Sequence, residues 1–485
     1  MSTIIVIEFA VYLLGMLGVG LYFARKHMDQ KEFHLGGRKL PGWALALSER
    51  ATGESAWLIL GLSGLAFAEG LASIWTAAGC VLGIVVSWLW LSHKFREEAL
   101  KYDSLTMCDY LATKFKKQGA FIRWYSAVII IFFYGLYVVA QFSGGGKTVH
   151  QTLGLPVHWG ILLTGLVVVL YSMAGGFSAV VYTDAIQAIL MMLAFFVTPI
   201  VALVHIWQQD LSIARALTEA SVQTGIGFNS LTGGLMGFTL GVMIFNHFSW
   251  FFGYMGGQPQ LNARWMAMGS AKQVKIGQWI AIIWTIMAYA GVIMIGLTAI
   301  TLYGPDAVAD KEQILPFMLL KLMPAWLAGI VLTGAVAAMM STASSQLLVA
   351  TSTISEDILH KALKIKLSDK KLVLVSRLTI LVVGLGSLAL AFTSTKMIYT
   401  VVGWAWAGIG CSFAPAILLS FFWRKFNGYG VAGSLIGGSV TTVVWMTTGL
   451  DQVFTARAAA FIVAFLAALA CTYAFAGKHK ATGAA

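Results

Sequence analysis

The stretch that decides the fold runs Leu47-Ser48-Glu49-Arg50-Ala51-Thr52-Gly53-Glu54-Ser55-Ala56-Trp57. Three charges and a glycine lie in the middle of a long apolar segment. A continuous helix facing lipid could not carry them, whereas a broken helix that lines a cavity could. We expect the helix to unwind here and its freed backbone carbonyls to bind a cation. Arg50 and Glu54 are spaced i, i+4, so a buried structural ion pair is the competing interpretation.

The composition around this stretch is that of a membrane protein. Of the 485 residues, 59% are hydrophobic and 11% are charged, whereas soluble domains carry about 25% charged residues. Apolar segments of about 20 residues recur along the chain, and this length crosses a hydrocarbon core of about 30 Å. A soluble enzyme, a nucleic-acid-binding protein and a disordered scaffold are therefore excluded. We expect a single all-α transmembrane domain over residues 1–485.

Thirteen spans are predicted from the apolar segments and the loops between them. They cover residues 4–24, 43–68, 72–92, 121–146, 157–180, 185–206, 231–257, 276–303, 326–355, 373–394, 397–422, 428–448 and 457–476. The first span is too long for a cleaved signal peptide and lacks its flanking residues, so we expect it to remain as a helix.

The basic residues divide the loops into two sets. They gather in residues 25–39, 94–117, 264–275, 361–371, 424–425 and 478–480, whereas the intervening loops hold few. This asymmetry follows the positive-inside rule, and it explains the net charge of +12 without a nucleic-acid partner. It predicts an N-terminus outside and a C-terminus in the cytoplasm, in a plasma membrane such as the bacterial inner membrane.

Motifs for covalent or metal-dependent chemistry are lacking, so we expect no enzyme. The sequence has no P-loop, no GxSxG and no zinc-ligand histidine pair. Its cysteines Cys80, Cys108, Cys411 and Cys471 show neither metal nor disulfide spacing. No predicted loop is long enough for a nucleotide-hydrolysing domain, so active transport would have to draw on an ion gradient.

A second helix break is expected in the span 231–257. Gly253, Gly256 and Gly257, followed by Pro259, cannot sustain a regular helix. The aromatic residues just before them could cover an apolar or cationic ligand, although an aromatic stripe alone is more often packing.

Hydroxyl groups and one acid complete the polar set. Ser341 and Thr342 lie in the span 326–355, where such residues commonly bond to their own helix but could also ligate Na⁺. Asp184 precedes the span 185–206, so it could cap that helix or attract a cation at the inner mouth.

The positions of the two breaks predict an internal repeat. Each break lies in the first of five consecutive spans, which is the pattern of transporters with inverted repeats. We expect residues 43–206 to form the first five-helix repeat and 231–422 the second. Residues 4–24 would be an extra N-terminal helix, and 428–476 would be two C-terminal helices.

A series of short motifs follows in order along nearly the whole chain. They are Leu35-Gly36-Gly37-Arg38, Ala51 to Gly61, Gly175-Gly176-Phe177 through Thr183-Asp184 and Gln187, Gly257-Gln258-Pro259 with Ala263-Arg264, Ala338 to Thr342, Gln346 to Val349 with Glu356-Asp357, and Ala405 to Gly408. Together they resemble the sodium/solute symporter family, and within it most closely the sodium/proline symporters.

The resemblance implies a LeuT-type fold of about thirteen helices that works by alternating access, with Na⁺ as the coupling ion. The sodium site that it implies comprises the backbone carbonyls of Ala51, Glu54 and Ala338 and the hydroxyls of Ser341 and Thr342.

The resemblance also implies the contacts of the transported solute. They are Ser55, Trp57, Tyr137, Phe251, Tyr254, Met255, Gln258 and Pro259. Asp184 matches the family's acid near the inner sodium exit, and we assign Arg50 to gating beside it. Glu312 matches an acidic position in an outer loop.

Two departures from the family pattern affect these expectations. The proline symporters typically carry an aspartate where this chain has Gly53, and the acid here is the neighbouring Glu54. Their tryptophan and tyrosine in the seventh span are replaced by Phe251 and Met255, with Trp250 and Tyr254 one residue away. These changes bear on the solute and on the choice between sodium and proton coupling.

The predicted function is therefore a sodium-coupled symporter that imports proline or a related amino acid, with membrane lipid around it and no obligate protein partner. One alternative is a sodium- or proton-coupled symporter of a monocarboxylate or other organic anion, with Arg50 as the counter-charge. Another is a nutrient sensor on a transporter fold, which is disfavoured because we expect no signalling domain after Ala485.

Overall fold

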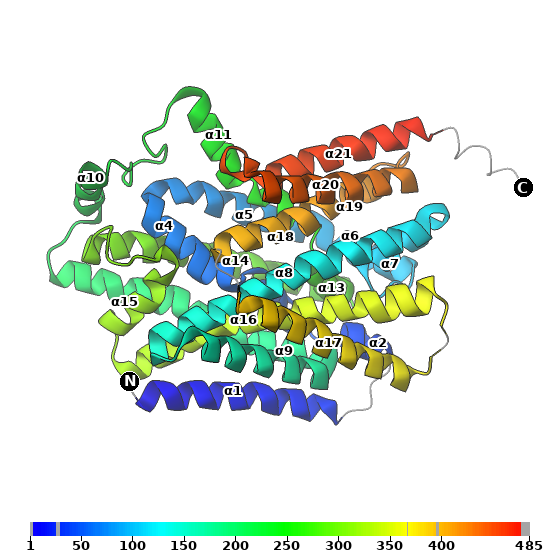
Figure 1. Ribbon diagram of the computed structural model, residues 1–485, viewed down its shortest axis with the longest axis horizontal. Coiled ribbons are helices and arrows are strands. Elements are labelled where there is room, and N and C mark those ends of the chain that lie inside the picture. Colours follow the sequence, from blue (N-terminus) through cyan, green and yellow to red (C-terminus); the bar gives the residue numbers. More distant parts are fainter. Residues whose placement is uncertain (1–2, 26–29, 366, 394–396, 477–485) are drawn as a thin grey trace, which may run out of the picture.

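The computed structural model describes residues 3–25, 30–365, 367–393 and 397–476, and every regular element in these ranges is a helix (Figure 1). The long helices lie side by side along one axis, with α1 on one flank and α20 and α21 on the opposite flank. Four of the loop charges used for the topology, Lys26, Lys366, Lys478 and Lys480, lie outside the described residues.

The bounds of the helices follow the chain. The helices that cross the bundle are α1 (Thr3–Ala24); α3 (Gly42–Gly53) with η2 (Trp57–Leu62) and α4 (Ser63–Glu69); α5 (Ile74–Val86) with η4 (Ser87–Leu91) and α6 (Ser92–Lys101); α8 (Gly119–Leu153); α9 (Val157–Gln208); α11 (Gly237–Phe248) with α12 (Trp250–Tyr254); α14 (Ala271–Tyr303); α16 (Ala325–Ser352) with η7 (Thr353–Ala362); α17 (Asp369–Ala391); α18 (Ile398–Ala405) with η8 (Trp406–Cys411) and α19 (Ser412–Phe422); α20 (Gly428–Thr448); and α21 (Ala456–Ala474). The shorter ones are α2 (Gln30–Leu35), η1 (Gly36–Arg38), η3 (Gly70–Ser73), α7 (Met107–Lys114), η5 (Lys116–Gln118), α10 (Ile213–Thr224), α13 (Pro259–Met266), η6 (Lys311–Gln313), α15 (Ile314–Leu322) and η9 (Leu450–Gln452).

Ten helical stretches among the described residues are long and apolar enough to cross a membrane. Val157–Gln208 contains two whole predicted spans, and Trp57–Lys101 contains part of one predicted span and the whole of the next. A straight helix of 52 residues would be about 78 Å long, more than twice the hydrocarbon thickness. The predicted span 231–257 is not among the ten because its helix is interrupted. The prediction of an all-α membrane protein is confirmed.

The long helix α9 bends sharply at Gly176. This residue has φ 60° and ψ −160°, and a Cβ built on it would lie 2.9 Å from a ring carbon of Phe33, so glycine is needed both for conformation and for space. The helix resumes at once and runs through Asp184. The interpretation of Asp184 as a helix cap is therefore wrong, because the break comes earlier in the chain than the predicted boundary between the spans.

The break expected in the second span is confirmed. Helix α3 ends at Gly53, and Glu54 leaves the helical region with φ −104° and ψ 10°. The chain then continues through the wide π-helical turns of η2 into α4. Because the last carbonyls of a helix lack partners within it, the end of α3 presents oxygens that can take partners from other helices, as the Thr52 carbonyl does with Thr342.

The break expected in the seventh span is also confirmed. Helix α12 ends at Tyr254, and α13 begins at Pro259 after a short irregular segment. Within that segment Gly256 has φ 77°, and a Cβ on Gly257 would lie 1.9 Å from the carbonyl oxygen of Gly410. The segment therefore packs backbone against backbone on η8.

Helix α16 occupies the centre of the bundle. In the most apolar 18-residue stretch of this helix, 89% of the residues are buried, compared with 33% in the corresponding stretch of α1. It contacts α1, α3, α8, α9 and α17. The hydroxyl-rich part of α16 is thereby placed against the broken end of α3.

Candidate functional site

Charged side chains of α3 form a buried cluster. Arg50 Nη1 lies 2.8 Å from Glu54 Oε1, so the expected i, i+4 pair is present. Arg50 also binds both carboxylate oxygens of Glu49, with Nε 2.5 Å from Oε2, and Trp88 Nε1 donates to that Oε2 at 3.0 Å. Two carboxylates share one guanidinium, so the cluster carries one negative charge in excess when both carboxylates are ionised.

The free side of Glu54 faces two tyrosines from other helices. Tyr289 of α14 donates a hydrogen bond of 2.7 Å to Glu54 Oε2, and Tyr254 of α12 donates one of 3.2 Å to the same oxygen. The carboxylate of the first broken helix is thus joined directly to the second broken helix. Among these partners, sequence reasoning missed Tyr289, which lies in an unremarkable apolar span.

A second buried ion pair lies beside the first. Asp184 Oδ2 is 3.0 Å from Arg264 Nη2 and accepts hydrogen bonds from Ser48 at 2.6 Å and Thr52 at 3.2 Å. Both charged residues are at most 1% exposed, so neither lies at an open inner mouth. In the sequence, Arg264 is visible only as a loop charge and as part of a motif. Its burial depends on the tertiary fold and could not be predicted from its neighbours in the chain.

The residues of the predicted sodium site lie where α3 and α16 meet. Thr342 Oγ1 donates to the carbonyl oxygen of Thr52 at 2.9 Å, and Thr52 and Ser345 share a hydrogen bond of 2.9 Å. Ala51, Glu54, Ala338 and Ser341 are fully buried. The Ser341 hydroxyl makes no hydrogen bond to a described residue. Neutral oxygens of this kind suit a hard, weakly held cation.

Three of the predicted solute contacts come together below an aromatic layer. Tyr137 donates to Ser55 Oγ at 3.1 Å and accepts from Trp406 Nε1 at 3.0 Å. Trp57 packs on Trp250, with ring centroids 4.2 Å apart. The indole nitrogen of Trp57 is buried and makes no hydrogen bond to a described residue.

The predicted contacts from the seventh span are distributed over both sides of the break. Tyr254 faces the cluster through Glu54, as described above, whereas the Phe251 ring packs on Phe248 at 5.4 Å. Trp250, one residue earlier, is the residue that reaches Trp57. Met255 lies in the irregular segment itself and is partly exposed.

Gln258 and Pro259 follow the break. Both amide atoms of Gln258 are buried without a partner among the described residues. Pro259 borders a cavity of only about 30 Å³, which His34 also lines. The buried and unsatisfied amide of Gln258 is the feature expected of a group that meets a polar ligand.

Glu312 anchors the start of α18. It is 1% exposed, pairs with Lys147 Nζ at 3.0 Å, and accepts the backbone N–H groups of Ile398 and Tyr399 at the start of α18. Burial alone would raise the pKa of the neighbouring loop residue Asp310, but the hydrogen bond and charge of Lys147 hold that pKa below its usual value.

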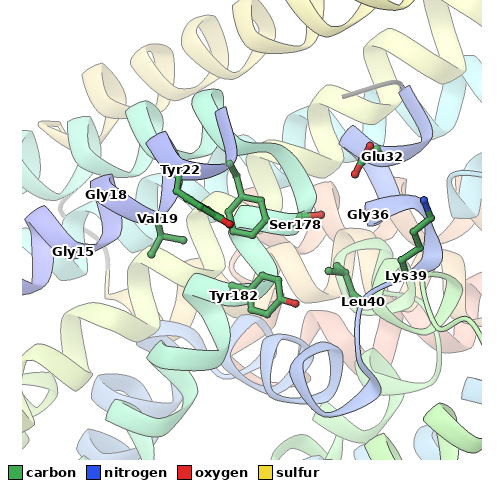
Figure 2. A pocket seen from close by; sticks show the side chains of 11 residues that line it. Gly15, Gly18, Val19, Tyr22, Glu32, Gly36, Lys39, Leu40, Ser178 and Tyr182 are labelled. Carbon is green, nitrogen blue, oxygen red and sulfur yellow. The ribbon is translucent and has the colours of Figure 1, made fainter. Parts of the chain in front are cut away.

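A further cavity lies apart from these residues. It measures about 730 Å³ on the flank formed by α1, α9 and the stretch 36–40. Figure 2 shows Tyr22 of α1, Tyr182 of α9 and Leu40 around it. None of the predicted site residues lines this cavity, so the polar site and the flank cavity are separate features.

Two helices that are broken inside an apolar bundle, with charges and hydroxyls converging between them, define a secondary transporter with discontinuous helices. A model described as the sodium:solute symporter family matches residues 33–438. The chain therefore belongs to the sodium:solute symporter family. It is an integral membrane protein that couples solute transport to Na⁺, and family membership confirms the prediction that it is not an enzyme.

Relatives in two bacteria cover nearly the whole chain. It is 34% identical to the osmoregulated proline transporter OpuE of Bacillus subtilis (strain 168), over 93% of this chain and 90% of that protein. It is 31% identical to the sodium/proline symporter of Escherichia coli (strain K12), over 92% of this chain and 89% of that protein.

Solved structures of transporters share the fold. A substrate-bound, outward-open Na⁺-coupled sialic acid symporter has a TM-score of 0.81 at 19% identity and covers 98% of both chains. Mhp1, a nucleobase-cation-symport-1 family transporter in a closed conformation, has a TM-score of 0.53 at 13% identity and covers 93% of this chain and 96% of that chain. These likenesses support the predicted LeuT-type fold.

Proposed function

We propose that the transported solute is proline or a closely related amino acid, imported together with Na⁺ by alternating access. The observation that carries the proposal is the meeting of the broken α3 with the hydroxyls of α16, next to a charge cluster that links both broken helices. The names of the relatives from Bacillus subtilis and Escherichia coli support proline as the solute.

Sodium would bind to the carbonyls of Ala51, Glu54 and Ala338 and the hydroxyls of Ser341 and Thr342. Its charge would offset the excess negative charge of the Glu49–Arg50–Glu54 cluster. This gives a physical reason for sodium to stabilise one state of the protein, because an ion shifts a conformational equilibrium only through its differential affinity for the two states.

The solute would bind beside Ser55 and Tyr137, under Trp57 and the wall from Trp250 to Tyr254, with Gln258 and Pro259 towards the inner side. Release inward would require the segment 255–258 to move from its contact with η8. Asp184 would take part in the release of sodium only after its ion pair with Arg264 opens.

The organic-anion alternative gains no support from Arg50. Its guanidinium is committed to Glu49, Glu54 and Thr285 Oγ1, so it has little capacity left for a carboxylate of a solute. For the cellular location, we propose the bacterial inner membrane, with the N-terminus outside and the C-terminus in the cytoplasm.

The test is uptake of radiolabelled solutes into proteoliposomes that contain the purified protein, with and without an inward sodium gradient. We expect proline uptake that exceeds uptake of acetate and propionate and that collapses when choline replaces sodium. Equal proline uptake without sodium would overturn the coupling. Uptake of another solute in place of proline would overturn the substrate.

A further inference from the structure

The cavity of about 730 Å³ on the flank of the bundle runs along an outward-facing stripe of α1. Four of its lining residues, Gly15, Gly18, Val19 and Tyr22, are spaced i, i+3, i+4 and i+7, so they lie on one face of that helix. Gly15, Gly18 and Tyr22 are exposed. Because α1 is one of the stretches that can cross a membrane, this face of the helix contacts lipid.

Two glycines of the stripe leave open space beside α1. A Cβ built on Gly15 or Gly18 would meet no atom within 4 Å, whereas one on Gly20 would lie 2.9 Å from the Cβ of Tyr171. Close packing therefore explains Gly20 but not the other two, although glycine is a poor helix former. The space beside Gly15 and Gly18 suits an apolar group from outside the chain, such as an acyl chain.

The opposite end of the cavity is charged. In Figure 2 the side chains of Glu32 and Lys39 lie at the end away from the glycines of α1. A second cavity, of about 330 Å³, shares these two residues and adds Lys31, Arg38 and Asp103 to the lining. Three cations therefore face two carboxylates, which leaves one positive charge in excess when both carboxylates are ionised.

Lys39 is the cation of this group that lacks a protein partner. Lys31 Nζ lies 3.2 Å from Asp103 Oδ2, and Arg38 Nη2 donates to the carbonyl oxygens of Ala99 and Ser104 at 3.4 and 3.0 Å. The Lys39 ammonium makes no ion pair or hydrogen bond to a described residue. A group with a single negative charge is the match for it, and basic pockets beside membrane-spanning helices bind the headgroups of acidic lipids.

A buried hydroxyl lies between the two ends. Ser178 of α9 lines the cavity and is 9% exposed, yet its hydroxyl makes no hydrogen bond to a described residue. Beside it the ring of Tyr182 stacks on Phe23 at 5.6 Å, and aromatic rings of this kind gather at the headgroup level of a membrane. The order of ammonium, hydroxyl and apolar groove matches the order of phosphate, glycerol esters and acyl chains in a phospholipid.

We propose that the two cavities form one binding site for an anionic phospholipid with a single charge, of the phosphatidylglycerol class. Its phosphate would bind Lys39, an ester carbonyl would accept from Ser178, and one acyl chain would lie along Gly15 and Gly18. A zwitterionic headgroup would leave the excess positive charge unmatched. The site is independent of the proposed solute, and its place in the inner leaflet rests on the proposed cytoplasmic side.

Such a lipid would connect three parts of the bundle. Its headgroup would hold residues 36–40, the stretch that leads into the broken helix α3, while its chain would lie against α1 and the bend of α9. The lipid would therefore stabilise the position of the segment that precedes the first helix break.

The first experiment titrates delipidated protein in detergent with phosphatidylglycerol and with phosphatidylethanolamine of the same chains, and native mass spectrometry reports the first lipid bound. We expect the wild type to prefer phosphatidylglycerol about fivefold, and Lys39→Gln to lose most of that preference, because one lysine near an acidic lipid contributes about this factor. Lys371→Gln, which changes an exposed lysine at a basic loop, should match the wild type. A wild-type preference for phosphatidylethanolamine, or an unchanged preference in Lys39→Gln, would overturn the proposal.

The second experiment tests the groove and the hydroxyl. Gly18→Leu fills the groove and should weaken phosphatidylglycerol binding several-fold, whereas Gly386→Leu in α17, where a Cβ also meets nothing within 4 Å, should not. Ser178→Ala removes the unpaired hydroxyl without adding volume and should weaken binding about threefold. Unchanged affinity in Gly18→Leu and Ser178→Ala would overturn the assignment of this cavity, and Ser178→Ala decides the matter if Gly18→Leu unfolds.

The third experiment distinguishes a lipid from other occupants. Glycerol 1-phosphate, which has the phosphate but no acyl chains, should not displace bound phosphatidylglycerol at an equal concentration. Displacement would show a site for free phosphate esters and would overturn the proposal. The same mass spectra count subunits, and we expect Gly18→Leu to have the subunit number of the wild type. A dimer lost in Gly18→Leu with lipid binding unchanged would assign the groove to a second copy of the chain instead.

Discussion

The Thr342 hydroxyl of α16 crosses to the broken end of α3, and the Ser341 hydroxyl beside it makes no hydrogen bond to a described residue. Thr333 bonds back to the carbonyl of Gly329 in its own helix at 2.8 Å, whereas Thr342 reaches across to Thr52. A side chain that crosses between helices beside free carbonyls is placed to ligate an ion.

Ser341→Ala combined with Thr342→Ala should raise the sodium concentration for half-maximal uptake about tenfold or more, since each oxygen removed is worth about 1 kcal/mol. The measurement is proline uptake against sodium concentration. Thr333→Ala is the matched control on the same helix and should leave the requirement unchanged. An unaltered sodium requirement in the double variant would place the ion elsewhere.

The Glu49–Arg50–Glu54 cluster makes a prediction about stability. Arg50→Gln leaves two buried carboxylates without a counter-charge, and breaking a buried pair in this way costs about 3–5 kcal/mol. We expect a clear fall in the midpoint of thermal unfolding. Adding Glu54→Gln restores the charge of the cluster, so the double variant should recover part of the loss.

The control for this cluster is the exposed pair Arg215–Glu219, whose side chains are 81% and 64% exposed. Arg215→Gln should change the midpoint little, because exposed pairs contribute about 0–1 kcal/mol. If Arg50→Gln were as mild as Arg215→Gln, the cluster would not hold the broken helix in place.

At the scale of the elements, the two helix breaks depend on local chemistry. Gly53 and the run from Gly253 to Pro259 weaken a regular helix, because glycine has a low helix propensity and proline lacks the backbone N–H, so both breaks could be predicted from the sequence. The bend at Gly176 could not, since the helix resumes immediately without a polar loop to mark it.

Partners across the bundle were harder to predict than breaks. The pairing of Asp184 with Arg264 joins residues 80 positions apart, and no local pattern encodes it. Trp250 rather than Phe251 reaches Trp57 because the turns around the break shift the phase of the helix. The sequence placed Trp250 next to the predicted contact Phe251, but only the fold shows which of the two rings packs on Trp57.

The segment after α12 predicts a sharp effect of one methyl group. A Cβ on Gly257 would lie 1.9 Å from the carbonyl oxygen of Gly410, which is backbone and cannot rotate away. Gly257→Ala should abolish or strongly reduce uptake while the protein still reaches the membrane. Gly241→Ala in α11, where nothing lies within 4 Å of the added Cβ, should transport normally. Uptake by Gly257→Ala equal to that of Gly241→Ala would show that this contact is not needed.

Helix α2 contacts the end of α16 and the start of η7 through His34. Its ring nitrogens lie 2.8 Å from Ser352 Oγ and 3.3 Å from Ser355 Oγ, and burial lowers the pKa of His34 from 6.5 to about 4. The unfolded chain therefore takes up the proton first as the pH falls. The stability that neutral His34 contributes is complete above pH 6.5 and is lost as the pH falls towards 4.

At pH 5 this linkage amounts to about 2 kcal/mol. The wild type should lose thermal stability between pH 7.5 and pH 5 more steeply than His34→Gln, when both are compared by unfolding midpoints at each pH. The exposed His158→Gln is the control and should follow the wild type. Parallel curves for all three proteins would show that His34 does not titrate with unfolding.

At the scale of the whole molecule, the site lies between regions that must move. The central helix α16 is almost wholly buried, whereas the broken segments contact it through hydrogen bonds and a few close backbone approaches. Sodium and solute would bind to the same moving segments from different sides. Each ligand therefore changes the energy of the state that the other needs.

Such coupling must be reciprocal, because linkage requires that the factor by which sodium raises the affinity for proline equal the factor by which proline raises the affinity for sodium. For the wild type we expect a factor of about 5–150, which corresponds to the usual range of coupling free energies. It is measured by equilibrium binding of proline at several sodium concentrations and of sodium at several proline concentrations. Ser341→Ala with Thr342→Ala should bring both factors towards one, since the ion would no longer distinguish the states. Thr333→Ala, the control on the same helix, should leave both factors at the wild-type value. Factors that stayed at the wild-type value in the double variant would mean that these two hydroxyls do not couple the ion to the solute.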